Sequence, residues 1–212
     1  LGVIGPDGRG SAHHTGTADR ADLMMGTFSK SLGCMGGFLA GEKDVIKLIR
    51  HKARCFIFTA SPTPAVAGGV LKAMEIMRAE PWRIERLWEN THRMHAGFRE
   101  LGFHIGTTET PIVPILVGDE QKAFFFAQRL FDNGIFATPA IYPAVRRGQA
   151  IIRTSYMATH TPEQLDHVLE AFGRIARELR IFEDEAYQRA AGEIPQRCHD
   201  RPLPKPARPA AV

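Results

Sequence analysis

The segment from Gly26 to Gly37, read as Gly-Thr-Phe-Ser-Lys-Ser-Leu-Gly-Cys-Met-Gly-Gly, constrains the fold more than any other part of the chain. Apolar runs precede it at 21–26 and follow it at 38–41, and both are expected to form short strands. Gly-rich turns that join strands are common beside ligands in α/β folds. The segment therefore predicts an α/β fold in which Lys30 lies in a turn behind a buried strand.

Lys30 is the candidate catalytic residue. A lysine amine forms a Schiff base only when it is deprotonated, and partial burial in an apolar pocket favours the neutral amine. The hydroxyls of Thr27 and Ser29, with glycine amides beside them, are suited to hold a phosphate dianion. The alternative is an exposed loop lysine, because a short Ser-Lys-x-x-Gly pattern arises often by chance.

The pattern of apolar residues divides the chain into four parts. Residues 62–104 read as a helical connector that is interrupted at Pro81, and the following part reads as βαββα. The predicted parts are the C-terminal portion of a large domain at 1–61, the connector at 62–104, a small α+β domain at 105–182 and a disordered tail at 183–212.

Shorter elements are predicted within these parts. Residues 1–20 read as loop, and the expected helices cover 44–54, 120–133 and a last helix that begins with a Thr161 N-cap and a capping box. The expected strands, besides the two that flank the Gly-rich turn, cover 55–59, 112–117, 135–138 and 151–156.

Composition narrows the class of partner. The formal net charge of +4 suits an anionic substrate such as a coenzyme A thioester, and it allows loose peripheral contact with an acidic membrane. Basic residues are not interleaved with aromatic ones, so we expect no nucleic acid partner. The 3 cysteines lack C-x-x-C spacing, which predicts a reduced, cytoplasmic chain, and no His/Cys/Asp cluster predicts a metal site.

The Gly26–Gly37 segment resembles the T-[LF]-S-K-[AS]-x-G-x-x-G-G signature of the α-oxoamine synthases, a family of class II pyridoxal-phosphate (PLP) acyltransferases. The likeness extends over nearly the whole chain to about Phe182. The family has the fold of fold-type I PLP transferases, so the resemblance implies an α/β large domain, here incomplete, and a small α+β C-terminal domain. It implies that Lys30 forms the Schiff base with PLP and that Thr27 contacts the cofactor phosphate.

The resemblance assigns three further residues. The run Phe-Thr-Ala-Ser-Pro at 58–62 is similar to a family segment whose hydroxyls reach the cofactor phosphate of the dimer partner, a role that falls to Thr59 and Ser61. A helix N-cap ahead of Pro62 is the structural alternative. Arg153, in Ile-Ile-Arg-Thr-Ser, matches the arginine that binds the amino-acid carboxylate. Its alternative is a surface arginine paired with a glutamate.

The family's large N-terminal part, absent from this sequence, carries the histidine that stacks on the pyridine ring and the aspartate of D-x-A-H that pairs with the ring nitrogen. The chain alone is therefore expected to be inactive, and a catalytically incompetent fragment or partner subunit is the alternative from another class. A plain aminotransferase is disfavoured by the G-x-x-G-G continuation after Lys30.

The resemblance implies a homodimeric enzyme that condenses an amino acid with an acyl-CoA, with loss of carbon dioxide, to give an aminoketone. Residues 143–161 look most like bacterial serine palmitoyltransferase-like proteins, which favours serine with a long-chain acyl-CoA and a role in sphingolipid synthesis. The alternatives are 8-amino-7-oxononanoate synthase, of biotin synthesis, and 2-amino-3-ketobutyrate CoA ligase, which share every motif quoted.

Overall fold

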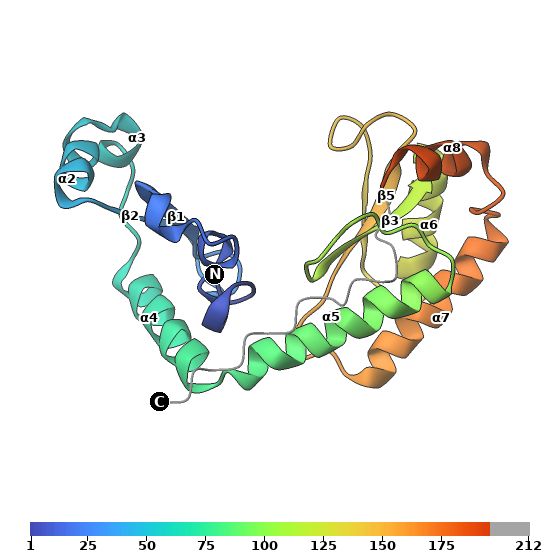
Figure 1. Cartoon of the computed structure of the whole chain (residues 1–212), viewed down its shortest axis with the longest axis horizontal. Coiled ribbons are helices and arrows are strands. Elements are labelled where there is room, and N and C mark those ends of the chain that lie inside the picture. Colours follow the sequence, from blue (N-terminus) through green and yellow to red (C-terminus); the bar gives the residue numbers. More distant parts are fainter. Residues whose placement is uncertain (196–212) are drawn as a thin grey trace. The chain divides into compact units, whose positions relative to one another are not determined.

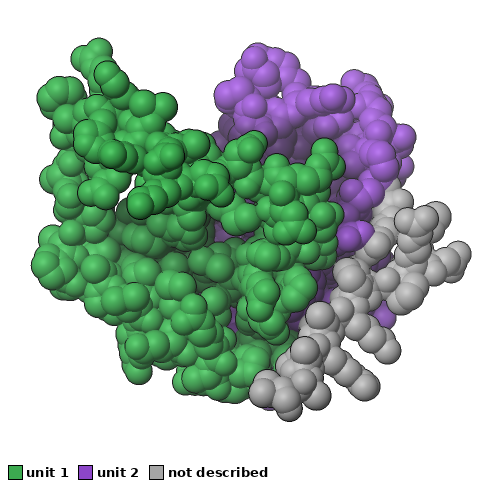
Figure 2. Space-filling model, turned by 60° about the vertical axis from the view of Figure 1, so that its left-hand side comes forward, with its two compact units in different colours: residues 1–85, 206–212 green, residues 86–205 purple. Residues whose placement is uncertain are grey.

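The computed structural model describes residues 1–195, and within them the chain forms two compact units that divide after Glu85. Figure 2 draws the two units in separate colours. The boundary lies inside a helix of the predicted connector, α5 (Trp82–Glu100), because its first turn belongs to the first unit and the rest to the second. The connector thus contributes to both units and is not a separate part of the fold.

The first unit is built around a hairpin and two longer helices (Figure 1). Strands β1 (Leu23–Thr27) and β2 (Gly37–Gly41) lie close to the predicted 21–26 and 38–41, and they pair antiparallel with Thr27 opposite Gly37. The expectation that the first strand is buried is wrong, because the residues of β1 are exposed or half-buried. The other elements of this unit are η1 (Pro6–Gly8), α1 (Ser11–His14), η2 (Ala18–Arg20), α2 (Lys43–Lys52), α3 (Arg54–Ile57) and α4 (Pro64–Ala79). The first twenty residues therefore contain short helical turns where the sequence predicted only loop.

The predicted strand at 55–59 is wrong. The amides of Phe56 and Ile57 both donate to the carbonyl of Ala53 at 3.0 Å, so this run forms the helical turn α3. A short apolar run is compatible with either a strand or a helix, and here local hydrogen bonds decide.

The second unit contains a three-stranded antiparallel sheet in the order β3-β5-β4. Its strands are β3 (Ile112–Gly118), β4 (Thr138–Ala140) and β5 (Ala150–Ser155). Helices α6 (Glu120–Asp132), α7 (Pro162–Glu178) and α8 (Glu185–Glu193) complete the unit with most of α5. The predicted capping box is confirmed, because the Thr161 hydroxyl accepts from the Gln164 amide and the Gln164 side chain accepts from the Thr161 amide.

Strand β4 begins three residues later than the predicted 135–138. The amide of Ile135 donates to the Leu130 carbonyl at 2.9 Å, and Gly134 has a φ of 76°. These residues close the C-terminus of α6 in the manner of a left-handed glycine cap, so they are not free to pair with β5.

The expectation of disorder from residue 183 onward fails for α8. The Asp184 carboxylate caps this helix by accepting from the Ala186 amide at 2.8 Å, and Tyr187 and Ala190 are buried in the core. At Gly118, which has a φ of 89°, an added Cβ would lie 2.6 Å from the Tyr187 nitrogen, so α8 packs directly on the end of β3. Residues 196–212 lie outside the described residues.

The core of the second unit is a cluster of aromatic rings between helices and sheet. Phe172 on α7 packs against Phe98, Phe103 and Phe126 with ring centroids 5.0, 6.0 and 5.2 Å apart. All four side chains are at most 1% exposed. The rings join α5, α6, α7 and the loop before β3 into one core, and the sheet packs against this core.

Two adjacent phenylalanines of α6 test this core. Phe126→Ala should destabilise the protein by about 3–5 kcal/mol, because it removes a fully buried ring and leaves a cavity. Phe125→Ala, where the ring is 62% exposed, should change stability by less than about 1 kcal/mol. Urea unfolding of the two variants measures the difference, and equal losses would contradict the assigned core.

Candidate active site

The Gly-rich turn between β1 and β2 holds the predicted phosphate-binding hydroxyls together. The oxygen atoms Thr27 Oγ1 and Ser29 Oγ lie 2.8 Å apart in a hydrogen bond, and the Ser29 amide donates to Thr27 Oγ1 at 3.2 Å. The Phe28 amide donates to the Gly36 carbonyl at 2.9 Å and closes the base of the turn. The two hydroxyls are therefore fixed side by side, directly before Lys30.

Lys30 is exposed in this structure, and the apolar pocket that the sequence predicted around it is not formed by residues 1–195. Its backbone is nevertheless held, because its carbonyl accepts from the Gly33 amide at 3.0 Å. The next side chain, Ser31, donates from its hydroxyl to the Leu1 carbonyl at 2.5 Å, and Leu32 is buried at 4% exposure. The turn thus anchors the residues that follow Lys30 and leaves the lysine amine accessible.

The glycines of this segment permit close backbone approach. An added Cβ at Gly37 would lie 2.7 Å from the Gly26 carbonyl oxygen, and one at Gly26 would lie 2.3 Å from the Phe38 ring. Glycine is therefore required where the two strands meet at the mouth of the turn. Helix α4 also packs here, since an added Cβ at Gly69 would lie 3.1 Å from Cys34 Sγ.

Thr59 and Ser61 are both exposed on the segment that follows α3. The Thr59 hydroxyl donates to the Cys55 carbonyl within its own helical turn. The N-cap of α4 is Thr63, whose hydroxyl accepts from the Val66 amide, so neither Thr59 nor Ser61 caps this helix. The segment runs beside the Gly-rich turn, because an added Cβ at Gly36 would lie 3.6 Å from Pro62 Cγ.

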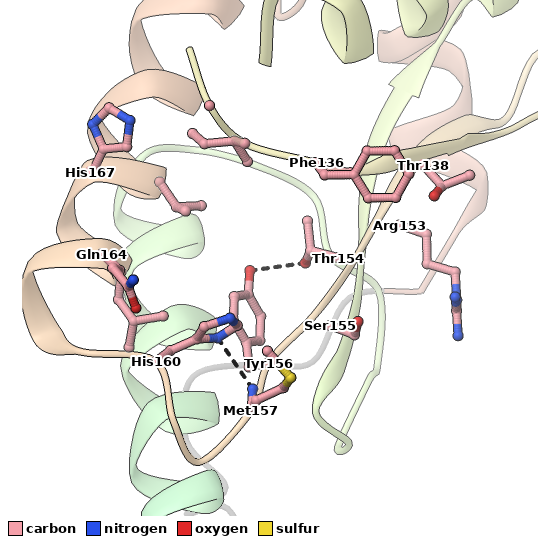
Figure 3. A pocket seen from close by; sticks show the side chains of 15 residues that line it. Phe136, Thr138, Arg153, Thr154, Ser155, Tyr156, Met157, His160, Gln164 and His167 are labelled. Atoms are coloured by element: carbon pink, nitrogen blue, oxygen red, sulfur yellow. Dashed lines mark hydrogen bonds between the residues drawn. The ribbon is translucent and has the colours of Figure 1, made fainter. Parts of the chain in front are cut away.

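Arg153 belongs to the second unit. It lies on β5, opposite Pro114 of β3 and Thr138 of β4. The guanidinium makes no ion pair or hydrogen bond with another residue among 1–195, so the alternative of an arginine paired with a glutamate does not hold there. Strand alternation places Arg153 and Ser155 on the side of β5 opposite Thr154 and Tyr156 (Figure 3).

Sequence reasoning missed a cavity of about 440 Å³ in the second unit. It lies where the loop before β4, the end of β5 and the start of α7 meet, and Tyr156, His160 and Gln164 are among its lining residues (Figure 3). Burial lowers the pKa of His160 below its usual value and raises that of Tyr156. A partial signal for this cavity was present in the sequence, because His160 and Gln164 flank the Thr161 cap that the capping box identified.

Within residues 1–195, no group of three or more His, Cys, Asp or Glu side chains is placed to hold a metal ion, and no helix there is long and apolar enough to cross a bilayer.

Comparison with known proteins identifies the family. Residues 3–172 match the model of the family described as aminotransferase class I and II. The chain belongs to the aminotransferase class I and II family. It is 48% identical over 181 residues to the 8-amino-7-oxononanoate synthase of Symbiobacterium thermophilum, and 46% identical over 181 residues to the serine palmitoyltransferase of Sphingobacterium spiritivorum.

Both relatives are α-oxoamine synthases, which confirms the resemblance drawn from the Gly26–Gly37 segment. The alignments cover 85% of this chain and 46% and 45% of the relatives, so the chain spans about half the length of the curated relatives it matches. The structure resembles a high-resolution structure of SPT with PLP, with a TM-score of 0.81 at 33% identity, over 85% of this chain and 46% of that one. The prediction of a fold-type I PLP transferase is confirmed.

The family depends on PLP, and the residues of the turn fit this cofactor. PLP carries an aldehyde and a phosphate, and the turn offers an accessible amine on Lys30 next to the paired hydroxyls of Thr27 and Ser29. The glycines at 26 and 37 allow the close contacts with the Phe38 ring and between the two strands that hold the mouth of the turn together.

Two glycine substitutions test the geometry of the turn. Gly37→Ala should open the hairpin and reduce PLP uptake at least tenfold, because the new Cβ overlaps the Gly26 carbonyl. Gly68→Ala in α4, where an added Cβ meets nothing within 4 Å, should keep PLP uptake and raise stability by about 0.5–1 kcal/mol. Cofactor absorbance after dialysis measures uptake, and unchanged binding in Gly37→Ala would contradict the assigned turn.

Proposed function

We propose that the protein to which this chain belongs is an α-oxoamine synthase, which condenses an amino acid with an acyl-CoA and releases carbon dioxide and coenzyme A. The observation that carries the proposal is the fixed Thr27–Ser29 hydroxyl pair directly before Lys30, in a chain 46–48% identical to such enzymes. The expectations of a homodimer and of a cytoplasmic location belong to the same proposal.

The residues of the chain are assigned distinct tasks. Lys30 Nζ would hold the cofactor at its aldehyde carbon, and as a free amine it would take the proton from the substrate α-carbon. Thr27 Oγ1, with Ser29 Oγ beside it, donates to the phosphate and holds the cofactor in place. When bound, PLP supplies an electron sink for the negative charge at the α-carbon.

Arg153 is assigned to the carboxylate of the amino acid. Its planar guanidinium can bind a carboxylate with two parallel hydrogen bonds, and no described residue competes for it. Thr59 and Ser61 are assigned to the cofactor phosphate of a dimer partner. Their exposure is compatible with that role, because a residue that reaches across an interface must lie on the surface of its own chain.

For the substrates we propose serine with a long-chain acyl-CoA. The likeness to serine palmitoyltransferases at 46% identity supports this pair. The pair of 8-amino-7-oxononanoate synthase is supported equally well, by the 48% identity to the Symbiobacterium enzyme. Both reactions use the same assigned residues and differ only in the amino acid and the acyl chain.

A two-way assay separates these candidates. The purified protein that contains this chain is tested with serine, alanine and glycine, each against palmitoyl-CoA and a pimeloyl thioester. We expect the largest kcat/KM for serine with palmitoyl-CoA, measured by coenzyme A release and mass spectrometry of the aminoketone. A preference for alanine with the pimeloyl thioester would transfer the assignment to the second candidate, and no aminoketone with any pair would overturn both.

Arg153→Ala should raise the KM for the amino acid by about 10–100-fold and leave PLP uptake unchanged, because a charged hydrogen-bond partner of the substrate is lost. Arg153→Lys should recover only part of this loss, since lysine lacks the planar fork. Arg174→Ala is the matched control, because that arginine is engaged at the surface with Glu178 and Asn133. Equal losses of amino-acid and PLP binding in Arg153→Ala would show a structural role instead.

A further inference from the structure

The excess positive charge of the chain is concentrated in one short segment, residues 43–54, which covers α2 and the start of α3. Of the 27 Lys and Arg and 23 Asp and Glu residues in the chain, this segment holds 5 and 1, and the rest of the chain holds 22 of each. The formal charge of the segment therefore equals the +4 of the whole chain, and the remainder is balanced.

Three of these cations form a row along α2, called the basic row below. Lys43, Lys47 and Arg50 are spaced i, i+4 and i+7, which places them on the same side of the helix. All three are exposed, and within residues 1–195 none of them forms an ion pair. Asp44 lies in the first turn of α2 but does not pair with them.

Other cations at similar spacing, on α4 and α5, are neutralised by carboxylates three residues away. The pairs, with N–O distances of 3.1, 2.6 and 3.0 Å, are Lys72–Glu75, Arg83–Glu80 and Arg86–Glu89. The basic row thus differs from these cations, because the described chain supplies no counter-charge for it. A row of exposed cations without counter-charges favours an anionic partner.

The setting of α2 indicates which kind of anionic partner fits. The helix packs against β2 and α3 (Figure 1), with Ile46 and Ile49 half-buried, so the row is presented on a supported helix. Single-stranded nucleic acid requires aromatic side chains between the cations, and α2 contains no Phe, Tyr or Trp. A folded or peptide partner requires apolar anchors, which the row lacks. A lipid surface presents many anionic groups in no fixed register and requires only the charges.

We propose that the basic row is a docking surface for an anionic lipid membrane, where Lys43, Lys47 and Arg50 contact the charged head groups. Lys52 and Arg54, in the same segment and also exposed, add to the attraction. Each cation near such a surface contributes modestly and is screened by salt, so the binding is reversible and needs no insertion into hydrocarbon. This surface is independent of the proposed function, because it involves neither cofactor nor substrate.

Co-sedimentation with vesicles tests the proposal on the whole protein that contains this chain. We expect binding at low ionic strength to phosphatidylcholine vesicles with about 30% phosphatidylserine, and little binding to pure phosphatidylcholine. Raising the salt to about 1 M should release the protein, because the Debye length then falls to about 3 Å.

The triple variant Lys43→Gln, Lys47→Gln and Arg50→Gln should bind these vesicles about 100-fold more weakly, since each cation contributes about fivefold. Lys47→Glu is a second variant with a single substitution, and the charge reversal should weaken binding about 25-fold. Both variants should keep the wild-type circular dichroism, because the replaced side chains are exposed.

The matched control removes the same charge from cations outside the row, with the substitutions Lys72→Gln, Arg83→Gln and Arg86→Gln. It should change vesicle binding less than about threefold, because these cations are paired and lie outside the contact. Equal losses in the control and the triple variant would show a response to net charge alone and would overturn the proposal.

Absence of binding to the phosphatidylserine vesicles, or binding that high salt does not reduce, would also overturn it. Preferential binding of polyglutamate or of single-stranded RNA would assign the row to an acidic protein or a nucleic acid and would reject the membrane. Because co-sedimentation measures no turnover, failure of the docking surface leaves the proposed function untouched, and an inactive protein can still bind vesicles.

Discussion

The hairpin of the first unit depends on a close backbone approach at its mouth, where an added Cβ at Gly37 would lie 2.7 Å from the Gly26 carbonyl oxygen. This approach fixes the ends of β1 and β2, and the turn between them is then closed by the hydrogen bond from Phe28 to Gly36. The Thr27–Ser29 hydroxyl pair and the position of Lys30 both follow from it. The proposed chemistry therefore depends on two residues that have no functional group of their own.

The second unit is organised by a different constraint, the packing of four phenylalanine rings between its helices and sheet. Because β5 is buried on the side of Ile152 and Thr154, alternation along the strand directs Arg153 to the other side, where no described group neutralises it. Arg153 nevertheless lines the same cavity as Tyr156 and His160, so the end of β5 brings the carboxylate-binding candidate and these two side chains to one site.

Several elements of the fold could be predicted from the sequence, because the residues that determine them are close together along the chain. The glycine spacing gives the hairpin, Pro81 gives the break between α4 and α5, and the Thr161 cap gives the start of α7. Two elements were predicted wrongly, one because it lacks such a local signal and the other because its signal was overlooked. The 55–59 run is apolar without periodicity, whereas α8 has an Asp184 cap and buried residues at helical spacing, Tyr187 and Ala190, that the polar surroundings concealed. The environment of Lys30 and the cavity beside His160 depend on contacts between distant segments, which no local pattern encodes.

Borohydride reduction tests whether Lys30 carries the cofactor, as proposed above. The PLP-loaded protein that contains this chain is reduced, digested and analysed by mass spectrometry, with the Lys30→Ala variant as control. We expect a pyridoxyl group on the peptide that contains Lys30 and no specific label in the variant. A stoichiometric label on another lysine, retained in Lys30→Ala, would contradict it.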